Sequence, residues 1–250
     1  MPKFAANLTF LFTELPFMER FKAAKQAGFD AVEVLFPYDA SAQEMRHELI
    51  RHDLSFVLMN VPPPNYTGGD RGFAAVPGLE DRFRRDFDRA MRFADILKPR
   101  VIHIMAGKAE GTAARATYIA NLKWAAARAP KRRLTIEPIN PTDMPGYFLN
   151  GFDLAADILD AVAAPNLHLQ FDAYHAQMLT GDVAGAWAKH GRRAAHVQFA
   201  DAPGRGGPGS GKIDLEGFFA TLDADGYEGY ASAEYTPQAE TRETLGWLPR

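Results

Sequence analysis

The sequence contains no cysteine among its 250 residues, so it can form neither a disulfide bond nor a thiolate metal site. It also lacks a strong charge imbalance: the net charge is −3 and the pI is about 6.2. Such a balance gives no general electrostatic attraction to nucleic acid or to anionic membranes. No apolar run approaches the ~20 residues of a membrane-spanning helix, and Met1 to Phe4 open no long apolar segment of a secretory signal. We therefore expect a cytoplasmic protein without a nucleic-acid or membrane partner.

The composition is otherwise that of a globular protein with a large core, because 47% of the residues are hydrophobic and 24% are charged. Short apolar runs typical of buried strands alternate with amphipathic segments of helical periodicity. The expected strands cover residues 4–8, 30–36, 54–60, 101–105, 134–137, 167–172, 194–199 and 230–235. The expected helices cover residues 16–27, 41–52, 79–97, 112–129, 151–162, 181–190 and 214–223, with one or two further turns after residue 237. Ser41, followed three residues later by Glu44, is typical of a capped helix N-terminus.

This alternation continues without a linker or a change of composition, and it gives about eight strand–helix units. The number and the length predict a single (β/α)₈ TIM barrel that occupies residues 1–250 as one domain. A doubly wound sheet is the main alternative, but no Gly-x-Gly-x-x-Gly turn follows the first strand, and the glycine-rich segment 204–209 comes too late. Two long loops, 61–77 and 201–212, have lengths that are typical of functional loops, and we expect them to close over a substrate.

Polar residues recur at the ends of the later strands. Strand side chains alternate between two faces, and in a barrel one face points to the axis. On four successive strands the axial face ends in a polar residue: Glu137, Asp172, Gln198 and Glu234. A barrel interior is normally filled with branched apolar side chains, and unpaired buried carboxylates cost several kcal/mol each. A divalent cation bound by three carboxylates and an amide oxygen removes that cost, and these ligands suit Mg²⁺, Mn²⁺ or Co²⁺.

Other polar residues share the axial face. Glu33 and His103 lie on it, and Glu33 alone is most simply a loop salt bridge or a helix cap. His103 suits a substrate contact and a structural role equally. His175, three residues after Asp172, is a candidate hydrogen-bond donor to a substrate. The remaining histidines fall into two groups: His168 and His196 are expected to form hydrogen bonds in the core, and His47, His52 and His190 to be solvated on helices.

A cationic residue lies in the glycine-rich loop. Arg205 stands between Gly204 and Gly206, where a guanidinium could bind a substrate carboxylate through two hydrogen bonds. Lys212 and Lys108 are further cationic candidates for the same task.

Several segments resemble the hydroxypyruvate isomerase family over nearly the whole chain. The segments are VLFPY at 34–38, HIMAG at 103–107, TIEPIN at 135–140, FDAYHAQ at 171–177, HVQFADAPGR at 196–205, GYEGY at 226–230 and EYTP at 234–237. That family belongs to the xylose isomerase-like barrels, together with ketose 3-epimerases and 2-oxotetronate isomerases. The resemblance implies a metal held by Glu137, Asp172, Gln198 and Glu234. It also implies that the two glutamates act as catalytic acid and base, and that His175 and Arg205 lie near the substrate.

The chain departs from the family in the loop that carries Arg205. The family reads Pro-Gly-Arg-x-Glu-Pro-Gly-Thr-Gly-Glu there, whereas Gly207 and Lys212 stand at the two glutamate positions of this sequence. The loss of two acids beside the candidate clamp leaves the substrate assignment open.

The expected activity is metal-dependent aldose–ketose isomerisation of a small hydroxy-carbonyl acid, such as hydroxypyruvate to tartronate semialdehyde, through a cis-enediolate. Mg²⁺ or Mn²⁺ is the expected cofactor, with Co²⁺ and Zn²⁺ as further candidates. A 2-oxotetronate isomerase, a ketose 3-epimerase and a non-catalytic sugar-acid-binding barrel are the alternatives, and a homo-oligomer is left open. A DNA-repair endonuclease would need a histidine-rich multi-zinc site, and a Schiff-base aldolase would need a lysine on an inner strand face; neither is evident.

Overall fold

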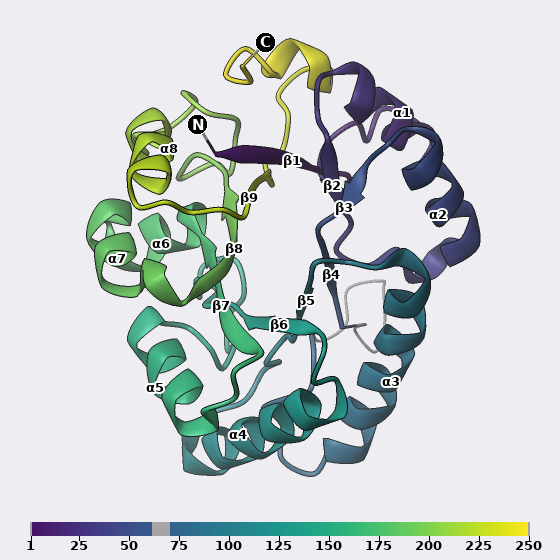
Figure 1. Cartoon of the computed structure of the whole chain (residues 1–250). Coiled ribbons are helices and arrows are strands. Elements are labelled where there is room, and N and C mark those ends of the chain that lie inside the picture. Colours follow the sequence, from purple (N-terminus) through teal and green to yellow (C-terminus); the bar gives the residue numbers. More distant parts are fainter. Residues whose placement is uncertain (1, 62–70, 250) are drawn as a thin grey trace.

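The computed structural model describes residues 2–61 and 71–249, and its strands form a parallel barrel with helices outside it (Figure 1). The strands are β1 (Lys3–Asn7), β2 (Ala31–Glu33), β3 (Ser55–Phe56), β4 (Leu58–Asn60), β5 (Val101–His103), β6 (Arg133–Ile136), β7 (Leu167–Asp172), β8 (Ala194–Phe199) and β9 (Tyr230–Ala233). Their order around the sheet is β3-β2-β1-β9-β8-β7-β6-β5-β4.

The barrel closes through one residue. Val57 alone separates β3 from β4; its N–H donates to Val32 O and its carbonyl accepts from Val101 N, both over 2.9 Å. The third expected strand is therefore present but divided at Val57 between two neighbours. The predicted TIM barrel is confirmed, since each strand pairs in parallel with the next unit along the chain.

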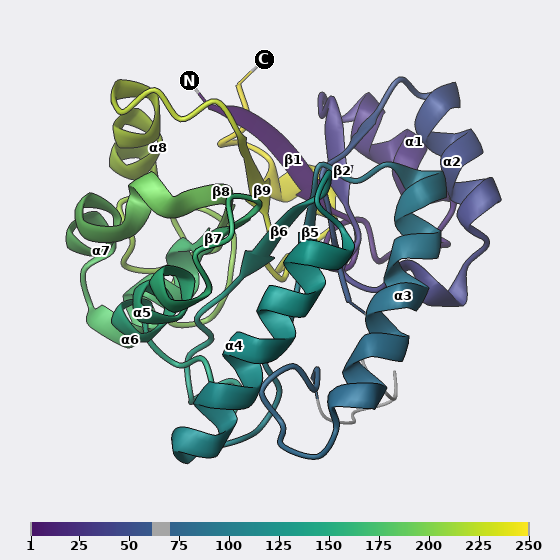
Figure 2. The same cartoon turned by 60° about the horizontal axis from the view of Figure 1, so that its bottom comes forward.

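The helices surround the barrel (Figure 2). They are α1 (Glu19–Gln26), α2 (Ala42–Arg51), α3 (Glu80–Leu97), α4 (Gly111–Arg128), α5 (Phe152–Val162), α6 (Ala173–Thr180), α7 (Val183–His190) and α8 (Leu215–Ala224). Short 3₁₀ turns cover Pro37–Asp39, Gly191–Arg193 and Thr241–Thr244, and the last of these is the turn expected near the end of the chain. Across the described ranges, no helix combines the length and the apolar character needed to cross a membrane.

Two helix starts show how side chains set the element boundaries. The Ser41 hydroxyl accepts from Glu44 N over 3.3 Å at the start of α2, as the sequence predicts. Helix α6 was not expected from the sequence. It begins because the Asp172 carboxylate accepts from Tyr174 N over 2.8 Å, so an axial acid also caps the next helix.

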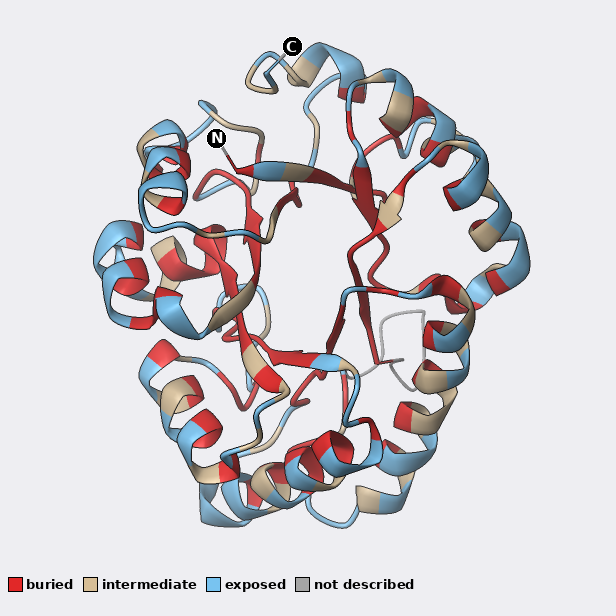
Figure 3. Cartoon of the chain, viewed as in Figure 1, coloured by how far each residue is buried: buried red, intermediate tan, exposed pale blue. Residues whose placement is uncertain are grey.

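Buried residues follow the strands and the inner faces of the helices, and exposed residues cover the outside (Figure 3). On α3 the inner face is apolar, and the Phe83 and Phe87 rings meet the Trp124 ring of α4 at 6.1 and 5.5 Å. On the other side of the barrel the fully buried Phe171 ring lies 5.0 Å from Phe152 and 5.1 Å from Trp187. This packing holds strand β7, and hence its terminal acid, in place.

Phe171→Ala should lower the free energy of unfolding by about 3–5 kcal/mol, because it leaves a cavity among packed rings. Urea denaturation followed by circular dichroism measures this loss. Ile50→Ala, at a side chain that is 61% exposed, is the control and should change the free energy by less than about 0.5 kcal/mol. Equal stabilities of the two variants would show that Phe171 is not part of the core.

Candidate active site

The polar residues expected on the axis lie together at the C-terminal ends of neighbouring strands. Glu137 follows β6, Asp172 ends β7, Gln198 lies on β8 and Glu234 follows β9. Each of these side chains is buried, with no more than 6% of its surface exposed. Strand pairing keeps their ends level, since Asp172 and Gln198 are register partners and Glu234 N donates to Phe199 O over 2.9 Å. They lie at the end of the barrel where barrel enzymes place their chemistry.

Three side chains with ligand atoms converge most closely. One such atom from each of Glu137, Asp172 and His175 lies within 4.8 Å of the others. Glu234 is close by, and its Oε2 atom has no hydrogen-bond partner in the described part of the chain. A buried carboxylate oxygen without a partner destabilises the folded state unless a cation or a ligand interacts with it. The donor set therefore fits a divalent cation that prefers oxygen ligands.

Burial and mutual repulsion perturb the two glutamates. Burial raises the pKa of Glu137 well above its ordinary value, and the Asp172 and Glu234 carboxylates raise it further. Burial also raises the pKa of Glu234 to about 8, although the Arg205 guanidinium acts in the opposite direction. Burial and repulsion thus oppose the charged form of both groups, and nearby positive charge favours it.

Arg205 supplies positive charge between two of these acids. Its Nη2 atom lies 2.7 Å from Glu234 Oε1 and 3.4 Å from Asp172 Oδ2. The guanidinium also lies 5.1 Å from the Phe10 ring centroid and 4.9 Å from the Tyr174 ring centroid. Burial opposes its charge, but the neighbouring carboxylates outweigh burial and raise the pKa of Arg205. The candidate clamp is thus a side chain fixed by rings and acids, with only 20% of its surface exposed.

Asp201 organises the loop that carries Arg205, and the sequence reasoning overlooked it. The carboxylate is 1% exposed and accepts four backbone N–H groups, those of Ala202, Gly209, Gly211 and Ile213. The sequence feature that could have indicated this role is an acid at a strand end, directly before a glycine-rich segment. The four hydrogen bonds fold the loop 201–212, which carries Arg205, back on itself.

The two departures from the family sequence lie on this loop. The Lys212 side chain is exposed, and its backbone N–H donates to Ala202 O over 2.9 Å. A Cβ atom at Gly207 would lie 3.2 Å from Tyr235 Cε2, which is tighter than nine in ten real Cβ contacts. A glutamate at position 207 would therefore require Tyr235 to shift, whereas glycine lets the loop pack against that ring.

His175 has a defined tautomer. Its Nδ1 atom accepts from the side-chain Nδ2 of Asn140 over 2.8 Å and from Asn140 N over 3.4 Å. The proton therefore sits on Nε2, which lies 3.6 Å from Asp172 Oδ2. Burial lowers the pKa of His175 to about 4, so the ring is neutral near pH 7. A neutral ring with Nε2–H is a hydrogen-bond donor to the site, and Asn140, which the sequence reasoning missed, sets that orientation.

His103 lies on the opposite side of Glu137. Its Nδ1 atom lies 3.5 Å from Glu137 Oε2 and 3.3 Å from Asn60 Oδ1, both of which are acceptors, so Nδ1 carries the proton. Burial lowers the pKa of His103 to about 3. The other nitrogen, Nε2, is buried without a hydrogen-bond partner in the described residues and can accept a hydrogen bond.

Glu33 is a buried hub, and its interpretation as a loop salt bridge or helix cap was wrong. Its Oε1 accepts from Asn7 Nδ2 and from Gln198 Nε2, each over 2.8 Å. Its Oε2 lies 2.7 Å from His196 Nε2. The network continues because Gln170 Nε2 donates to Gln198 Oε1 over 2.6 Å and to Glu137 Oε2 over 3.1 Å. Glu33 thereby fixes the Gln198 amide, one of the expected metal ligands.

The remaining histidines divide differently from the prediction. His196 is a core hydrogen-bonding residue, as expected, whereas His168 is half-buried and has no hydrogen-bond partner among residues 2–61 and 71–249. His190 was expected to be solvated, but it is 6% exposed, and its Nε2 lies 3.0 Å from Asp153 Oδ1. The prediction for His190 was wrong because the C-terminal turn of α7 packs on α5, and the Phe152 ring lies 5.9 Å away. His47 is exposed, as expected, and His52 is partly exposed beside Glu48.

Glu33→Ala should lower the free energy of unfolding by about 3–5 kcal/mol, because it leaves three buried polar side chains without their common partner. Urea denaturation measures the change. Glu216→Ala, at an exposed position of α8, is the control and should cost less than about 0.5 kcal/mol. A loss below 1 kcal/mol for Glu33→Ala would mean that the hub does not stabilise the barrel interior.

Comparison with known proteins identifies relatives of this chain. A family model described as a xylose isomerase-like TIM barrel matches residues 21–250. The 2-oxo-tetronate isomerase of Cupriavidus necator is 43% identical over 254 residues, which cover 99% of this chain and 98% of that protein. The hydroxypyruvate isomerase of Escherichia coli is 37% identical over 99% of this chain and 98% of that protein.

Solved structures share the fold of this chain. A structure described as an AP endonuclease of family 2 from Brucella melitensis is 40% identical, has a TM-score of 0.96, and covers 99% of this chain and 98% of its own. A D-psicose 3-epimerase from Clostridium cellulolyticum, at 14% identity, shares the fold with a TM-score of 0.76 over 99% of this chain and 90% of its own. The resemblance to hydroxypyruvate isomerases is confirmed by these matches, and the chain belongs to the xylose isomerase-like TIM barrel family.

Proposed function

We propose that the chain is a metal-dependent isomerase that interconverts an aldose and a ketose form of a small hydroxy-carbonyl acid. The observation that carries the proposal is that Glu137, Asp172 and Glu234 are all buried at the C-terminal end of the barrel. Ligand atoms of Glu137 and Asp172 lie within 4.8 Å of each other, and Arg205 contacts both Asp172 and Glu234. The activities named for its full-length relatives, hydroxypyruvate isomerase and 2-oxo-tetronate isomerase, support it. Hydroxypyruvate, or a related 2-oxo acid, is the substrate class that these names suggest.

The metal would be held by Glu137, Asp172, Gln198 and Glu234. The unpartnered Oε2 of Glu234 and the mutually repelling buried acids fit a divalent cation. Oxygen ligands favour Mg²⁺ or Mn²⁺, and Co²⁺ or Zn²⁺ also accept such a set. When bound, the cation would polarise the substrate carbonyl and stabilise negative charge on its oxygens. His175 is a substrate donor in this proposal, not a ligand, because its Nε2 carries a proton.

The two glutamates would move the protons. One carboxylate removes the proton from the carbon beside the carbonyl, which gives a cis-enediolate of the substrate. A proton returned to the neighbouring carbon, from the same or the other glutamate, completes the movement of the carbonyl. Glu137 and Glu234 suit these roles because their buried surroundings raise the pKa of both carboxyls, that of Glu234 to about 8.

The remaining polar groups would orient the substrate. His175 Nε2–H can donate to a substrate oxygen, and the unpartnered His103 Nε2 can accept from a substrate hydroxyl. Arg205 pairs with Glu234 and Asp172 in this structure. If a bound cation neutralised these two acids instead, the Arg205 guanidinium could bind the substrate carboxylate through two hydrogen bonds. Lys212, on the same loop, remains a candidate for a second contact to this carboxylate.

Alternative activities use the same groups. A 2-oxotetronate isomerase moves the carbonyl as well, a ketose 3-epimerase inverts one carbon, and a non-catalytic barrel binds a sugar acid without turnover. An endonuclease is disfavoured because the clustered ligand atoms in the described chain include a single histidine, His175. The single-domain organisation, a cytoplasmic location and any homo-oligomer stay predictions. Residues 62–70 of the expected covering loop 61–77 lie outside the described residues.

Protein treated with EDTA should lose isomerase activity and recover it with Mn²⁺ or Mg²⁺, because buried acids without a cation cannot polarise the carbonyl. The measurement is a product screen by NMR over hydroxypyruvate, 2-oxotetronates and free ketoses. Movement of the carbonyl in an acid substrate is the expected result, whereas inversion at one carbon of a ketose would identify an epimerase. Full activity of a verified metal-free preparation would contradict the proposed site.

Glu137→Gln and Glu234→Gln should each lower turnover by ~10²- to 10⁴-fold, because an amide cannot accept the substrate proton. Steady-state kinetics with saturating metal measure the effect, and circular dichroism verifies the fold. Glu216→Gln makes the same chemical change at an exposed position and should retain full turnover. Near-normal turnover in either active-site variant would remove that glutamate from the mechanism.

A further inference from the structure

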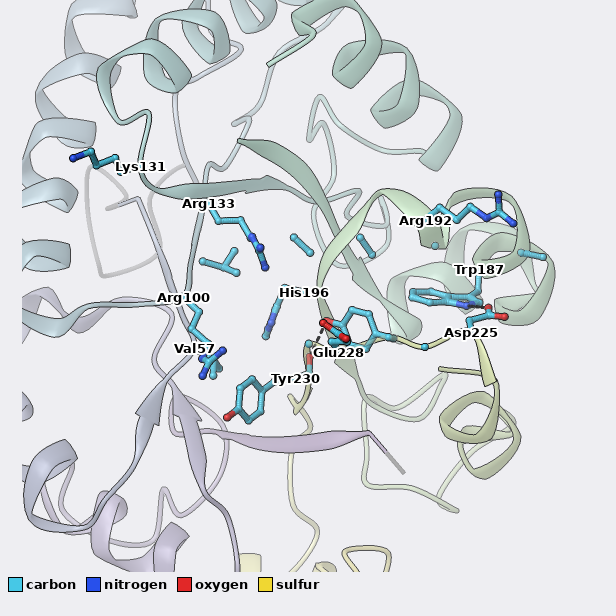
Figure 4. A pocket seen from close by; sticks show the side chains of 18 residues that line it. Val57, Arg100, Lys131, Arg133, Trp187, Arg192, His196, Asp225, Glu228 and Tyr230 are labelled. Atoms are coloured by element: carbon cyan, nitrogen blue, oxygen red, sulfur yellow. Dashed lines mark hydrogen bonds between the residues drawn. The ribbon is translucent and has the colours of Figure 1, made fainter. Parts of the chain in front are cut away.

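A second cavity opens at the other end of the barrel, where the strands begin (Figure 4). Its volume is about 1040 Å³, and we call it the N-terminal mouth. The first residues of four strands line it: Val101, Arg133, Ala194 and Tyr230. It therefore lies on the barrel axis, opposite the carboxylates of the candidate active site.

The sequence explains why this end is open. Branched apolar side chains usually fill a barrel interior, layer by layer. Here β8 contributes Ala194, and β6 contributes Arg133, which shares the axial face with Thr135 and Glu137 by the two-residue period of a strand. A methyl group and a long polar side chain leave space that a leucine or an isoleucine would occupy.

The mouth concentrates positive charge in a chain whose net charge is −3. Its lining holds four basic side chains, Arg100, Lys131, Arg133 and Arg192, against two acidic ones, Asp225 and Glu228. Asp225 accepts from Trp187 Nε1, which also lines the mouth, over 2.8 Å, and basic side chains still outnumber acidic ones four to two. None of the four basic side chains forms an ion pair with another described residue, so their charges remain available to a ligand.

Two of these cations come from neighbouring strand starts. Arg133 is the register partner of Val101, and Arg100 directly precedes Val101, so the two arginines enter the mouth from adjacent strands with an offset of one residue. Figure 4 shows the Arg133 guanidinium extending toward His196 and the Arg100 side chain turned toward Tyr230. The Arg100 guanidinium lies 5.1 Å from the Tyr230 ring centroid, which restrains it. Lys131 and Arg192 lie farther out (Figure 4).

We propose that the N-terminal mouth binds a small polyanion with phosphate-type oxygens, held between Arg100 and Arg133. A guanidinium presents a planar fork of donors that matches such oxygens, and two adjacent forks favour a ligand with more than one negative charge. A volume of about 1040 Å³ is that of a small-molecule pocket. The site is distinct from the proposed catalytic centre, since none of its lining residues is a candidate ligand or acid–base group there.

The N-terminal mouth also contacts the hydrogen-bonded side chains that surround Glu33 inside the barrel. His196 forms part of its lining, is 2% exposed, and contacts Glu33 Oε2 over 2.7 Å. Glu33 in turn holds Gln198, so a bound anion would lie at the far end of the hydrogen-bonded chain that reaches Glu137.

Isothermal titration calorimetry with inorganic pyrophosphate tests the site, on full-length protein freed of metal because pyrophosphate binds divalent cations. The wild type should bind one equivalent. The double variant Arg100→Gln/Arg133→Gln should bind at least about tenfold more weakly, because charge-assisted hydrogen bonds are lost. Arg133→Lys, which keeps the charge but loses the fork, should fall between the two. Both arginines are exposed, so these variants should fold normally.

Two control variants separate this site from other sources of binding. Arg115→Gln removes an exposed charge on α4, away from the mouth, and should leave the affinity within about twofold of wild type. Arg205→Gln tests the other end of the barrel and should also retain binding. No binding by the wild type at millimolar pyrophosphate, equal affinity in the Arg100/Arg133 double variant, or loss of binding in Arg205→Gln would each overturn the proposal.

Discussion

Burial of carboxylates along the barrel axis is the constraint on which the rest of the structure depends. A buried acid must be neutralised, hydrogen-bonded or protonated, and the axis shows all three solutions. Glu33 is satisfied by three side chains, Glu234 and Asp172 share Arg205, and Glu137 is left with a strongly raised pKa. Glu33 already has its hydrogen-bond partners. A cation or a substrate would therefore stabilise the structure most at the C-terminal end of the barrel, where Glu137, Asp172 and Glu234 are only partly neutralised.

The two ends of the axis carry opposite charge. Acids gather where the strands end, and where the strands begin lie Arg100 and Arg133, which form no ion pair with another described residue. A chain of side chains from His196 through Glu33, Gln198 and Gln170 to Glu137 joins the two ends through the barrel interior. Polar residues on the later strands thus line a path along the axis, whereas the early strands contribute an apolar cluster that includes Val57, Leu58 and Val101.

The sequence predicted the barrel and the placement of the axial acids because both follow from local rules. Strand alternation and strand ends are readable from neighbouring residues, which is why Asp172, Gln198 and Glu234 could be placed together. The role of Glu33 could not be read, since its partners His196 and Gln198 lie 163 and 165 positions away. The tautomer of His175 depends on Asn140, and the fold of the Arg205 loop depends on Asp201; both are contacts made after the chain has folded. Helix α6 was missed because its N-terminal cap is an acid that the sequence reasoning had assigned to a metal.

The central claim is that the buried acids at the C-terminal end of the barrel form one cation site. A crystal of the protein soaked in Mn²⁺, with data collected for anomalous scattering, addresses it most directly. We predict a single strong anomalous peak within bonding distance of Glu137, Asp172, Gln198 and Glu234, with the Arg205 guanidinium withdrawn from Glu234. An absence of anomalous density among these four residues at saturating Mn²⁺, with Arg205 still bound to Glu234, would contradict it.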